Sequence, residues 1–291
     1  ILNINFFNSV YMCKMDKIYP FNFLIVLFLL IEFNIEAQMY DKEYINTIRL
    51  MTYNTHYCKG GSDPGKIDMN NTRKLAQVIK ALDADVVALQ ELDSASRGRE
   101  YRYLLKQIAD ATGIEYIDIY GNADTFDHGA SLGCGVLVKK TIPIKNRKLI
   151  PLPGDEKRVA VYVELEDFVF VGTHFDLNDM KRIEGAKELC RYVREESKPV
   201  FLAGDLNDSH YWKSGGIAFP ILLEDFEIIS DVEGGSLSGR SDNGGLIDYV
   251  LLKRNSSRGI QDNHVLSENY LLMGLESIWE CYLIIIRFLL M

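Results

Sequence analysis

The chain has few cysteines and no cysteine pair of the kind that holds zinc. Five cysteines occur in 291 residues, and no two of them form a Cys-x-x-Cys motif. Cys13 and Cys281 lie near the two ends of the chain, which leaves the widely spaced Cys58, Cys134 and Cys190. An odd number of cysteines at such spacing indicates neither a zinc site nor a disulfide framework. We therefore expect these three side chains to be small, buried and unpaired thiols.

The sequence also has no cluster of lysines and arginines. The formal net charge is −9 and the pI is near 5.2, and the lysines and arginines form no basic stripe. Proteins that only bind nucleic-acid backbones usually carry such a stripe, because neutralised phosphates supply much of the affinity. The composition therefore argues against a pure nucleic-acid-binding module. It does not argue against an enzyme, because a metal site built from carboxylates is itself acidic.

No proline- or serine-rich linker and no internal repeat divides the chain. Hydrophobic residues make up 47% of it and charged residues 25%, which are ordinary proportions for a globular protein. We predict one domain over residues 38–268, preceded by a leader and followed by an atypical segment.

Residues 1–37 have the pattern of a secretory signal. Lys14 and Lys17 precede an apolar run over residues 21–31, and Ala37 offers a small residue after it. An apolar core of about 11 residues suits a signal peptide and is short for a membrane span. We expect cleavage near Ala37 and a secreted or periplasmic protein. An uncleaved membrane anchor is the alternative.

Short strand-like runs alternate with helical patterns along the middle of the chain. Helices are predicted at residues 70–82, 101–112 and 180–196. Strands are predicted at residues 49–52, 85–90, 116–120, 135–138, 142–150, 159–165, 168–173, 200–203 and 247–252. This order predicts an α/β fold in which two sheets pack face to face and helices lie outside them.

Residues 269–291 differ in character from the rest of the chain. They are apolar, and they lack a clean period, helix caps and turn signals. A membrane segment needs about 20 residues, which this stretch provides, but Glu276, Glu280 and Arg287 would each be costly in a bilayer. We favour a segment that is not native to the domain, produced by a shifted reading frame or a wrongly joined end.

Polar side chains stand at the ends of five predicted strands. They are Asn54, Glu91, His174, the pair Asp205 and Asn207, and Asp248. Each has an ordinary structural explanation when taken alone, such as turn chemistry or a half-buried histidine. Together they bring carboxylate, amide and imidazole groups to the strand ends, where α/β folds place their sites. Oxygen ligands with few histidines and no cysteine suit Mg²⁺ or Mn²⁺ better than zinc.

These residues belong to five motifs that together resemble the endonuclease/exonuclease/phosphatase superfamily of deoxyribonuclease-like hydrolases. The motifs are TYNTH (Thr52–His56), DVVALQEL (Asp85–Leu92), GTHFD (Gly172–Asp176), LAGDLND (Leu202–Asp208) and LIDYVLL (Leu246–Leu252). The resemblance covers residues 49–252. It implies a four-layer α/β sandwich and hydrolysis of a phosphodiester or phosphomonoester with a divalent metal ion.

The resemblance also implies a role for each matching residue. Glu91, assisted by Asn54, would hold the metal ion. Asp205 would orient or deprotonate the attacking water, and Asn207 beside it would contact metal-bound water or phosphate. His174 would donate to the phosphoryl oxygens as charge develops on them.

Three further positions carry less certain roles. Arg158 would either approach the phosphate or remain a solvated surface charge, and Asp176 is a candidate for supporting the site. In the family, Asp248 would pair with the histidine of a closing Ser-Asp-His motif, but this chain has no such motif, and His264 lies in a different context. The resemblance therefore implies that the last strand and the catalytic histidine are missing, which predicts weak activity and a tendency to aggregate.

The leading hypothesis is a secreted phosphoesterase that depends on Mg²⁺ or Mn²⁺ and works by in-line attack of water. Its substrate would be a small phosphoester, a lipid headgroup or a nucleic acid, and the acidic composition favours the first two over the third. No stable protein partner is indicated, and a monomer is expected. One alternative is a catalytically impaired family member that acts at most as a binding domain. Another is a membrane-tethered protein that uses both terminal apolar segments.

Overall fold

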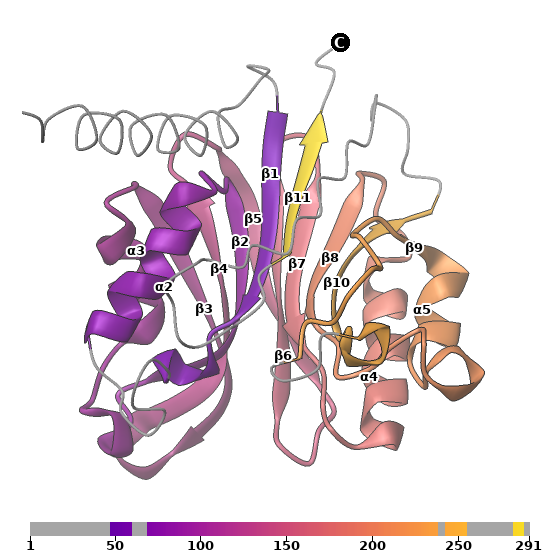
Figure 1. Cartoon of the computed structure of the whole chain (residues 1–291), viewed down its shortest axis with the longest axis horizontal. Coiled ribbons are helices and arrows are strands. Elements are labelled where there is room, and N and C mark those ends of the chain that lie inside the picture. The colour runs from indigo at the N-terminus through magenta and orange to yellow at the C-terminus, as the bar shows by residue number, and fades with distance from the viewer. Residues whose placement is uncertain (1–46, 60–68, 238–241, 255–281, 288–291) are drawn as a thin grey trace, which may run out of the picture. The chain divides into compact units, whose positions relative to one another are not determined.

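A computed structural model describes residues 47–59, 69–237, 242–254 and 282–287 (Figure 1). All of these residues belong to one compact unit, Tyr44–Met291. Two mixed β-sheets pack face to face at the centre of this unit, and helices cover their outer faces (Figure 1). The predicted four-layer α/β sandwich is confirmed.

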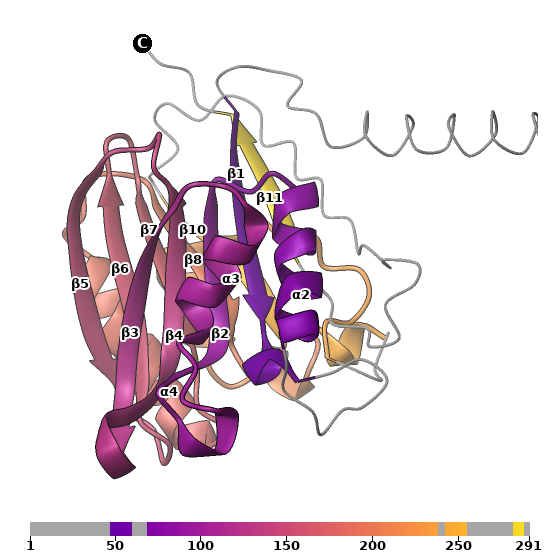
Figure 2. The same cartoon turned by 90° about the vertical axis from the view of Figure 1, so that its left-hand side faces the viewer.

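The first sheet has the strand order β11-β1-β2-β4-β3. Its strands are β1 (Thr47–Asn54), β2 (Val86–Ser94), β3 (Tyr116–Phe126), β4 (Ala130–Lys139) and β11 (Tyr282–Arg287). Strands β1 and β2 are parallel, and the other neighbours are antiparallel. Helices α2 (Met69–Ala81) and α3 (Leu104–Thr112) lie on the outer face of this sheet (Figure 2). Gly113 ends α3 in the left-handed conformation, with a φ of 70°, which a glycine adopts without steric cost.

The second sheet has the strand order β5-β6-β7-β8-β10-β9. Its strands are β5 (Ile144–Leu152), β6 (Arg158–Leu165), β7 (Val169–His174), β8 (Val200–Asp205), β9 (Phe226–Ile228) and β10 (Asp248–Lys253). Strands β7 and β8 are parallel, and the other neighbours are antiparallel. Helices α4 (Asp179–Val193) and α5 (Phe219–Asp225) cover its outer face (Figure 1).

Strands at the centre of each sheet are apolar on both faces because both faces are covered. All six residues of β7 and all six of β8 are buried. One apolar cluster fills the space between the sheets, and Val136, Phe170 and Phe201 belong to it. A second cluster, which includes Leu189 and Phe219, lies between the second sheet and its helices. Unbroken apolar strands of this kind are typical of sheets enclosed on both sides.

The predicted helices and strands are all present, with shifted ends. The largest shift among the strands is in β3, which continues to Phe126 instead of ending at Tyr120, and β2 continues through Glu91 to Ser94 instead of ending at Gln90. The short elements α5 and β9 were not predicted, because three to seven residues are too few to show a hydrophobic period. The prediction for the cysteines is confirmed, since Cys58, Cys134 and Cys190 are buried and unpaired.

The apolar tail contributes a strand, which corrects the expectation that the fold lacks its last strand. Residues Tyr282–Arg287 form β11, which pairs antiparallel with β1 from Thr47 to Thr52. The run is rich in isoleucine, a residue that favours strands, and it covers a β1 edge that would otherwise carry unpaired backbone groups. The predicted leader at residues 1–37 and the remainder of the tail lie outside the described residues.

The two sheets approach each other closely at Gly172 in β7. A Cβ atom at this position would lie 2.9 Å from Cγ2 of Val136 and 3.1 Å from Cβ of Ala88. Both neighbours are fully buried residues of the first sheet, so neither has free space into which to move. A larger residue would push the sheets apart two positions before His174.

We therefore predict that Gly172→Ala lowers the free energy of unfolding by about 1–3 kcal/mol, the usual cost of overpacking a core. The matched control is Gly98→Ala, where the nearest atom to the new Cβ lies 4.0 Å away. The control is expected to change stability by less than about 0.5 kcal/mol in either direction. Denaturant unfolding of both variants measures the difference, and equal stabilities would contradict close packing of the sheets at Gly172.

Candidate active site

Strand register brings the predicted polar residues to one end of the sandwich. His174 and Asp205 are the last residues of the parallel strands β7 and β8 and are aligned with each other. Asp248 opens β10 directly opposite Asp205, so the two carboxylates project from the same face of the sheet. Asn54 ends β1 in the first sheet and lies beside Gln90 of β2.

Glu91 lies at an irregularity in β2 rather than at its end. The pairing of β2 with β4 shifts between Leu89 and Leu92, and Glu91 has a φ of 50°. A bulge of this kind turns a side chain out of the regular alternation of the strand. Thr55 holds the bulge in place, because its hydroxyl hydrogen-bonds the backbone oxygens of Gln90 and Glu91 at 2.9 Å each.

Several residues around this end of the sandwich have left-handed backbone conformations. Besides Glu91, residues His56, Tyr57, Cys58 and Asn207 have φ values of 44°, 57°, 56° and 46°. Residues other than glycine adopt such angles at a cost, and they persist where the surrounding structure enforces them. Such residues occur at functional sites.

The side-chain amide of Asn54 connects two carboxylates that belong to different sheets. Its Nδ2 donates to Oε1 of Glu91 at 3.1 Å and to Oδ2 of Asp205 at 3.0 Å. Its Oδ1 accepts from the backbone N–H of His56 at 2.9 Å. Two negatively charged groups therefore converge on one neutral group.

The carboxylates of this set fit a hard divalent cation, and Asn54 would join them as a ligand through Oδ1 once its amide turns, because Nδ2 is the atom that faces both carboxylates here. Carboxylate and amide oxygens are the ligands that such cations prefer, and Mg²⁺ is commonly held by only one or two carboxylates plus water and substrate. Within the described residues, no cluster of three or more histidine, cysteine, aspartate or glutamate side chains is arranged to hold a metal ion. Glu91 and Asn54 are the residues present that would hold one, next to Asp205.

Two hydrogen-bond donors, one from Arg158 and one from Asn207, lie next to the two ring nitrogens of His174. Nη1 of Arg158 lies 3.2 Å from His174 Nδ1, and Nδ2 of Asn207 lies 3.0 Å from His174 Nε2. The guanidinium of Arg158 and the amide nitrogen of Asn207 can only donate, and a neutral imidazole accepts at only one of its two nitrogens, so the ring accepts from one of these groups and turns its own N–H toward the other. Nε2 also lies 3.7 Å from Oδ2 of Asp205. The N–H groups gathered here are of the kind that binds phosphate oxygens.

Arg158 is part of this arrangement, and its interpretation as a solvated surface charge is wrong. Its side chain is only 12% exposed, and its Nε lies 3.4 Å from Oδ2 of Asp176. Asp176 in turn accepts from the backbone N–H groups of Glu156 and Asn178. The supporting position proposed for Asp176 thus agrees with its contacts, because it orients the guanidinium that faces His174.

Burial shifts the pKa values of His174 and Asp205 in opposite directions. Burial, together with the neighbouring Arg158, lowers the pKa of His174 to about 3, so the ring is neutral near pH 7. Burial raises the pKa of the Asp205 carboxyl above its ordinary value, although hydrogen bonds from Asn54 and from the Asn207 backbone oppose the shift. A carboxylate with a raised pKa is a stronger base than an ordinary aspartate.

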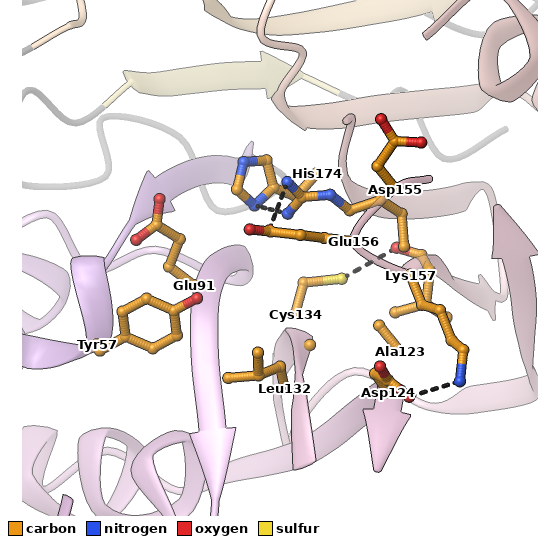
Figure 3. A pocket seen from close by; sticks show the side chains of 13 residues that line it. Tyr57, Glu91, Ala123, Asp124, Leu132, Cys134, Asp155, Glu156, Lys157 and His174 are labelled. Carbon is orange, nitrogen blue, oxygen red and sulfur yellow. Dashed lines mark hydrogen bonds and ion pairs between the residues drawn. The ribbon is translucent and has the colours of Figure 1, made fainter. Parts of the chain in front are cut away.

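A cavity of about 220 Å³ opens beside Glu91 and His174 (Figure 3). Tyr57 and Glu91 lie on one side of it in this view, and Asp155 and Lys157 lie on the other. Sequence reasoning missed Tyr57 and the charged run before β6 as parts of the site. Tyr57 directly follows the TYNTH motif, which was the one signal available, whereas the charged run has the composition of an ordinary loop.

Five of the six predicted site residues lie together, Asp248 lies next to them, and the histidine that the family pairs with Asp248 is not among the described residues. The structure brings together Asn54, Glu91, His174, Asp205 and Asn207 through the contacts above. Asp248 is 4% exposed and lies opposite Asp205, and its backbone N–H donates to Ser236 Oγ at 3.0 Å. His264, the histidine that follows Asp248 in the sequence, lies outside the described residues.

The fold is a four-layer α/β sandwich with polar residues clustered at its strand ends, and comparison with known proteins identifies the family. A family model described as the endonuclease/exonuclease/phosphatase family matches residues 51–264. The chain belongs to this family. Its members are generally hydrolases that act on phosphoesters, and they typically depend on divalent metal ions.

Solved structures share the fold at low sequence identity. An endonuclease/exonuclease/phosphatase from Beutenbergia cavernae DSM 12333 is 20% identical, with a TM-score of 0.64 over 84% of this chain and 72% of that one. A mannosyl-6-phosphatase from Bacteroides thetaiotaomicron VPI-5482 is 13% identical, with a TM-score of 0.57 over 84% and 100%. Truncated Caenorhabditis elegans TDP2 is 14% identical, with a TM-score of 0.59 over 83% and 97%. Comparison with curated protein sequences gives no match.

The lowered pKa of His174 predicts a pH dependence of stability. Between the unfolded pKa of about 6.5 and the folded value of about 3, the unfolded chain binds a proton that the folded chain does not. The free energy of unfolding should therefore fall as pH decreases through this window, by up to about 1.4 kcal/mol per pH unit. His174→Gln removes the group and should reduce that slope by this amount. Denaturant unfolding between pH 4 and 7 compares the two proteins, and parallel curves would contradict a buried, neutral His174.

Proposed function

We propose that this chain is a secreted phosphoesterase that depends on Mg²⁺ or Mn²⁺ and cleaves a phosphodiester or phosphomonoester by in-line attack of water. The observation that carries the proposal is the convergence of Glu91 and Asp205 on the amide of Asn54, with the donors of Arg158 and Asn207 next to them. One side of the arrangement attracts a cation, and the other side attracts an anion. A phosphoester bound with a divalent metal ion needs both.

Asp205 is suited to orient and deprotonate the attacking water. Its Oδ1 accepts from the backbone N–H of Asn207 at 2.8 Å, and its Oδ2 accepts from Asn54 at 3.0 Å. Both oxygens are thus fixed in direction before substrate binds, which is the pre-organisation that general-base catalysis requires. The raised pKa of Asp205 increases its affinity for the proton that water releases.

The donors around His174 are suited to bind the phosphoryl group. Neutral His174 offers one ring N–H, Asn207 offers its amide N–H, and Arg158 adds a positive charge. Negative charge on the phosphoryl oxygens is stabilised by donors that are already in position when the reaction begins. Asn207 is itself fixed, because its Nδ2 also donates to the backbone oxygen of Phe175 at 2.9 Å.

A divalent ion at Glu91 and Asn54 would polarise the phosphoryl group and steady the leaving oxygen. Glu91 supplies the anionic ligand, and its bulge directs the side chain toward Asn54 rather than into the sheet. The choice of Mg²⁺ or Mn²⁺ follows from the all-oxygen donor set.

Export of the protein is supported by the sequence pattern of residues 1–37. In the ranges that the structure describes, no helix is long and apolar enough to cross a membrane. The cleavage near Ala37 and the monomeric state remain predictions.

Substitution of the two central residues should reduce turnover more than substrate binding. We predict that Asp205→Asn and His174→Ala each lower kcat by about 10²-fold or more, because their interactions strengthen in the transition state. A chelator should abolish hydrolysis of p-nitrophenyl phosphate or its bis-ester, and Mg²⁺ or Mn²⁺ should restore it.

The matched control is Asp110→Asn, which removes an exposed carboxylate whose ion-pair partner is Lys106. This variant should retain the kcat of the unmodified chain. Near-normal kcat in either site variant would show that the site is placed wrongly, and full activity in chelator would rule out the metal ion.

A further inference from the structure

Tyr57 supplies a phenol to the wall of the cavity. The residue lines the cavity together with Glu91 and His174, and Figure 3 shows its hydroxyl end directed into that space. Among the residues that the structure describes, none forms a hydrogen bond with this hydroxyl. A phenol is protonated near pH 7, so the hydroxyl can donate to an oxygen atom of a bound ligand.

The backbone that carries Tyr57 is strained. The residue lies in the short 3₁₀ turn His56–Cys58, and the three residues of this turn have φ values of 44°, 57° and 56°. Left-handed angles cost energy in residues other than glycine, and they persist where neighbouring contacts enforce them. Contacts to the Tyr57 side chain are therefore needed to keep its hydroxyl in the cavity.

Arg99 makes such a contact. Its guanidinium lies over the Tyr57 ring, with the central carbon 3.9 Å from the ring centroid. A planar guanidinium stacks on an aromatic face and is attracted by the negative charge of that face. The side chain of Arg99 is only 18% exposed, so water screens this attraction little. Lys59 Nζ lies farther from the same centroid, at 5.6 Å.

A buried carboxylate holds the guanidinium of Arg99. Nη1 of Arg99 lies 2.5 Å from Oδ2 of Asp93, whose side chain is fully buried. Asp93 follows Glu91 by two residues on β2, so it belongs to the strand that carries the proposed metal ligand. Separating the two charges would leave a buried carboxylate without its cation, which is costly. Asp93 therefore keeps Arg99 over the ring.

The loop that carries Arg99 is also shaped by specific contacts. The backbone N–H groups of Arg99 and Tyr101 both donate to the backbone oxygen of Ser96, at 3.1 and 2.8 Å. The Arg102 side chain then connects the loop to α2, since its Nη2 donates to Oγ1 of Thr72 at 2.5 Å. Arg99 thus reaches Tyr57 from a loop whose conformation is fixed on both sides of it.

We propose that Arg99 is a positioning residue, which holds Tyr57 so that the phenol donates to an oxygen of the bound phosphoryl group. The hydroxyl would approach that group from the Glu91 side of the cavity, and the donors next to His174 would complete the set. Donors that are in place before a substrate binds stabilise developing charge without reorganisation. The inference rests on the proposed function, through its phosphoryl-binding donors, and adds one donor and the support of that donor.

Calorimetric titration of the full chain with inorganic phosphate, in the presence of Mg²⁺, tests the proposal without turnover. Tyr57→Phe keeps the ring and removes only the hydroxyl, so it should weaken phosphate binding by about threefold to tenfold, the usual contribution of one hydrogen bond. The matched control is Tyr192→Phe on α4, because this tyrosine also has a cation, Lys148 Nζ, 5.8 Å from its ring centroid. The control should bind phosphate as the unmodified chain does. Unchanged affinity in Tyr57→Phe, or no phosphate binding by the unmodified chain, would overturn the proposal.

Substitution of Arg99 by lysine separates positioning from a general structural role. Arg99→Lys keeps a positive charge for Asp93 but removes the planar group that covers the ring. It should weaken phosphate binding by about twofold to fivefold, the size of a cation–π contact. The matched control, Arg191→Lys, changes an exposed arginine paired with Glu188 and should have no effect.

The double variant shows whether Arg99 acts through Tyr57. In the Tyr57→Phe chain, Arg99→Lys should cause no further loss of phosphate affinity, because the hydroxyl that Arg99 positions is already absent. An equal loss with and without the hydroxyl would show a general structural effect and would overturn the proposal. If Arg99→Lys does not fold, Asp93→Asn combined with Arg99→Gln replaces the ion pair by a neutral pair and leaves no buried charge without a partner. The same comparison, with the same expected and contradicting results, then applies.

Hydrolysis of p-nitrophenyl phosphate and its bis-ester by the same proteins tests the proposed function separately. If both esters are inert while Tyr57→Phe and Arg99→Lys weaken phosphate binding as expected, the phosphoesterase proposal fails and the positioning of Tyr57 stands. If an ester is hydrolysed while phosphate affinity is the same in all variants, the positioning of Tyr57 fails and the proposed function stands.

Discussion

One amide group connects the two halves of the candidate site. Asn54 ends a strand of the first sheet, and its Nδ2 donates both to Glu91 of the same sheet and to Asp205 of the other. The two carboxylates would repel each other in this partly buried setting without a positive or donating group between them. A divalent cation supplies that charge more fully than an amide. The geometry of the whole site therefore depends on how the two sheets meet at Asn54.

The surrounding structure holds the sheets in that relation. Gly172 lets β7 approach Ala88 and Val136 of the first sheet, where any Cβ would collide. The bulge at Glu91 and the hydroxyl of Thr55 fix the metal-binding side. These features carry backbone strain, since Glu91 has a φ of 50°. Packing between the sheets compensates for the strain, which is the usual relation between a core and its functional site.

Site residues could be predicted from the sequence where polar side chains directly follow buried strands. Asn54, His174 and Asp205 were predictable because polar residues after buried strands gather at one edge of a sheet. The bulge at Glu91 was not predictable, since DVVALQEL shows no break where the register shifts. Arg158 was ambiguous because its burial depends on Asp176, which only the folded chain brings near. The tail strand β11 was misjudged because pairing with β1 depends on tertiary structure rather than on local pattern.

The central claim is that Glu91 and Asn54 hold a divalent cation next to Asp205. Crystals of the chain grown with Mn²⁺ and measured at the manganese absorption edge would locate the ion by its anomalous scattering. The account predicts a peak bound by a carboxylate oxygen of Glu91 and by the side chain of Asn54, and its loss in Glu91→Gln. A manganese ion held by other residues, or a peak that persists unchanged in Glu91→Gln, would contradict it.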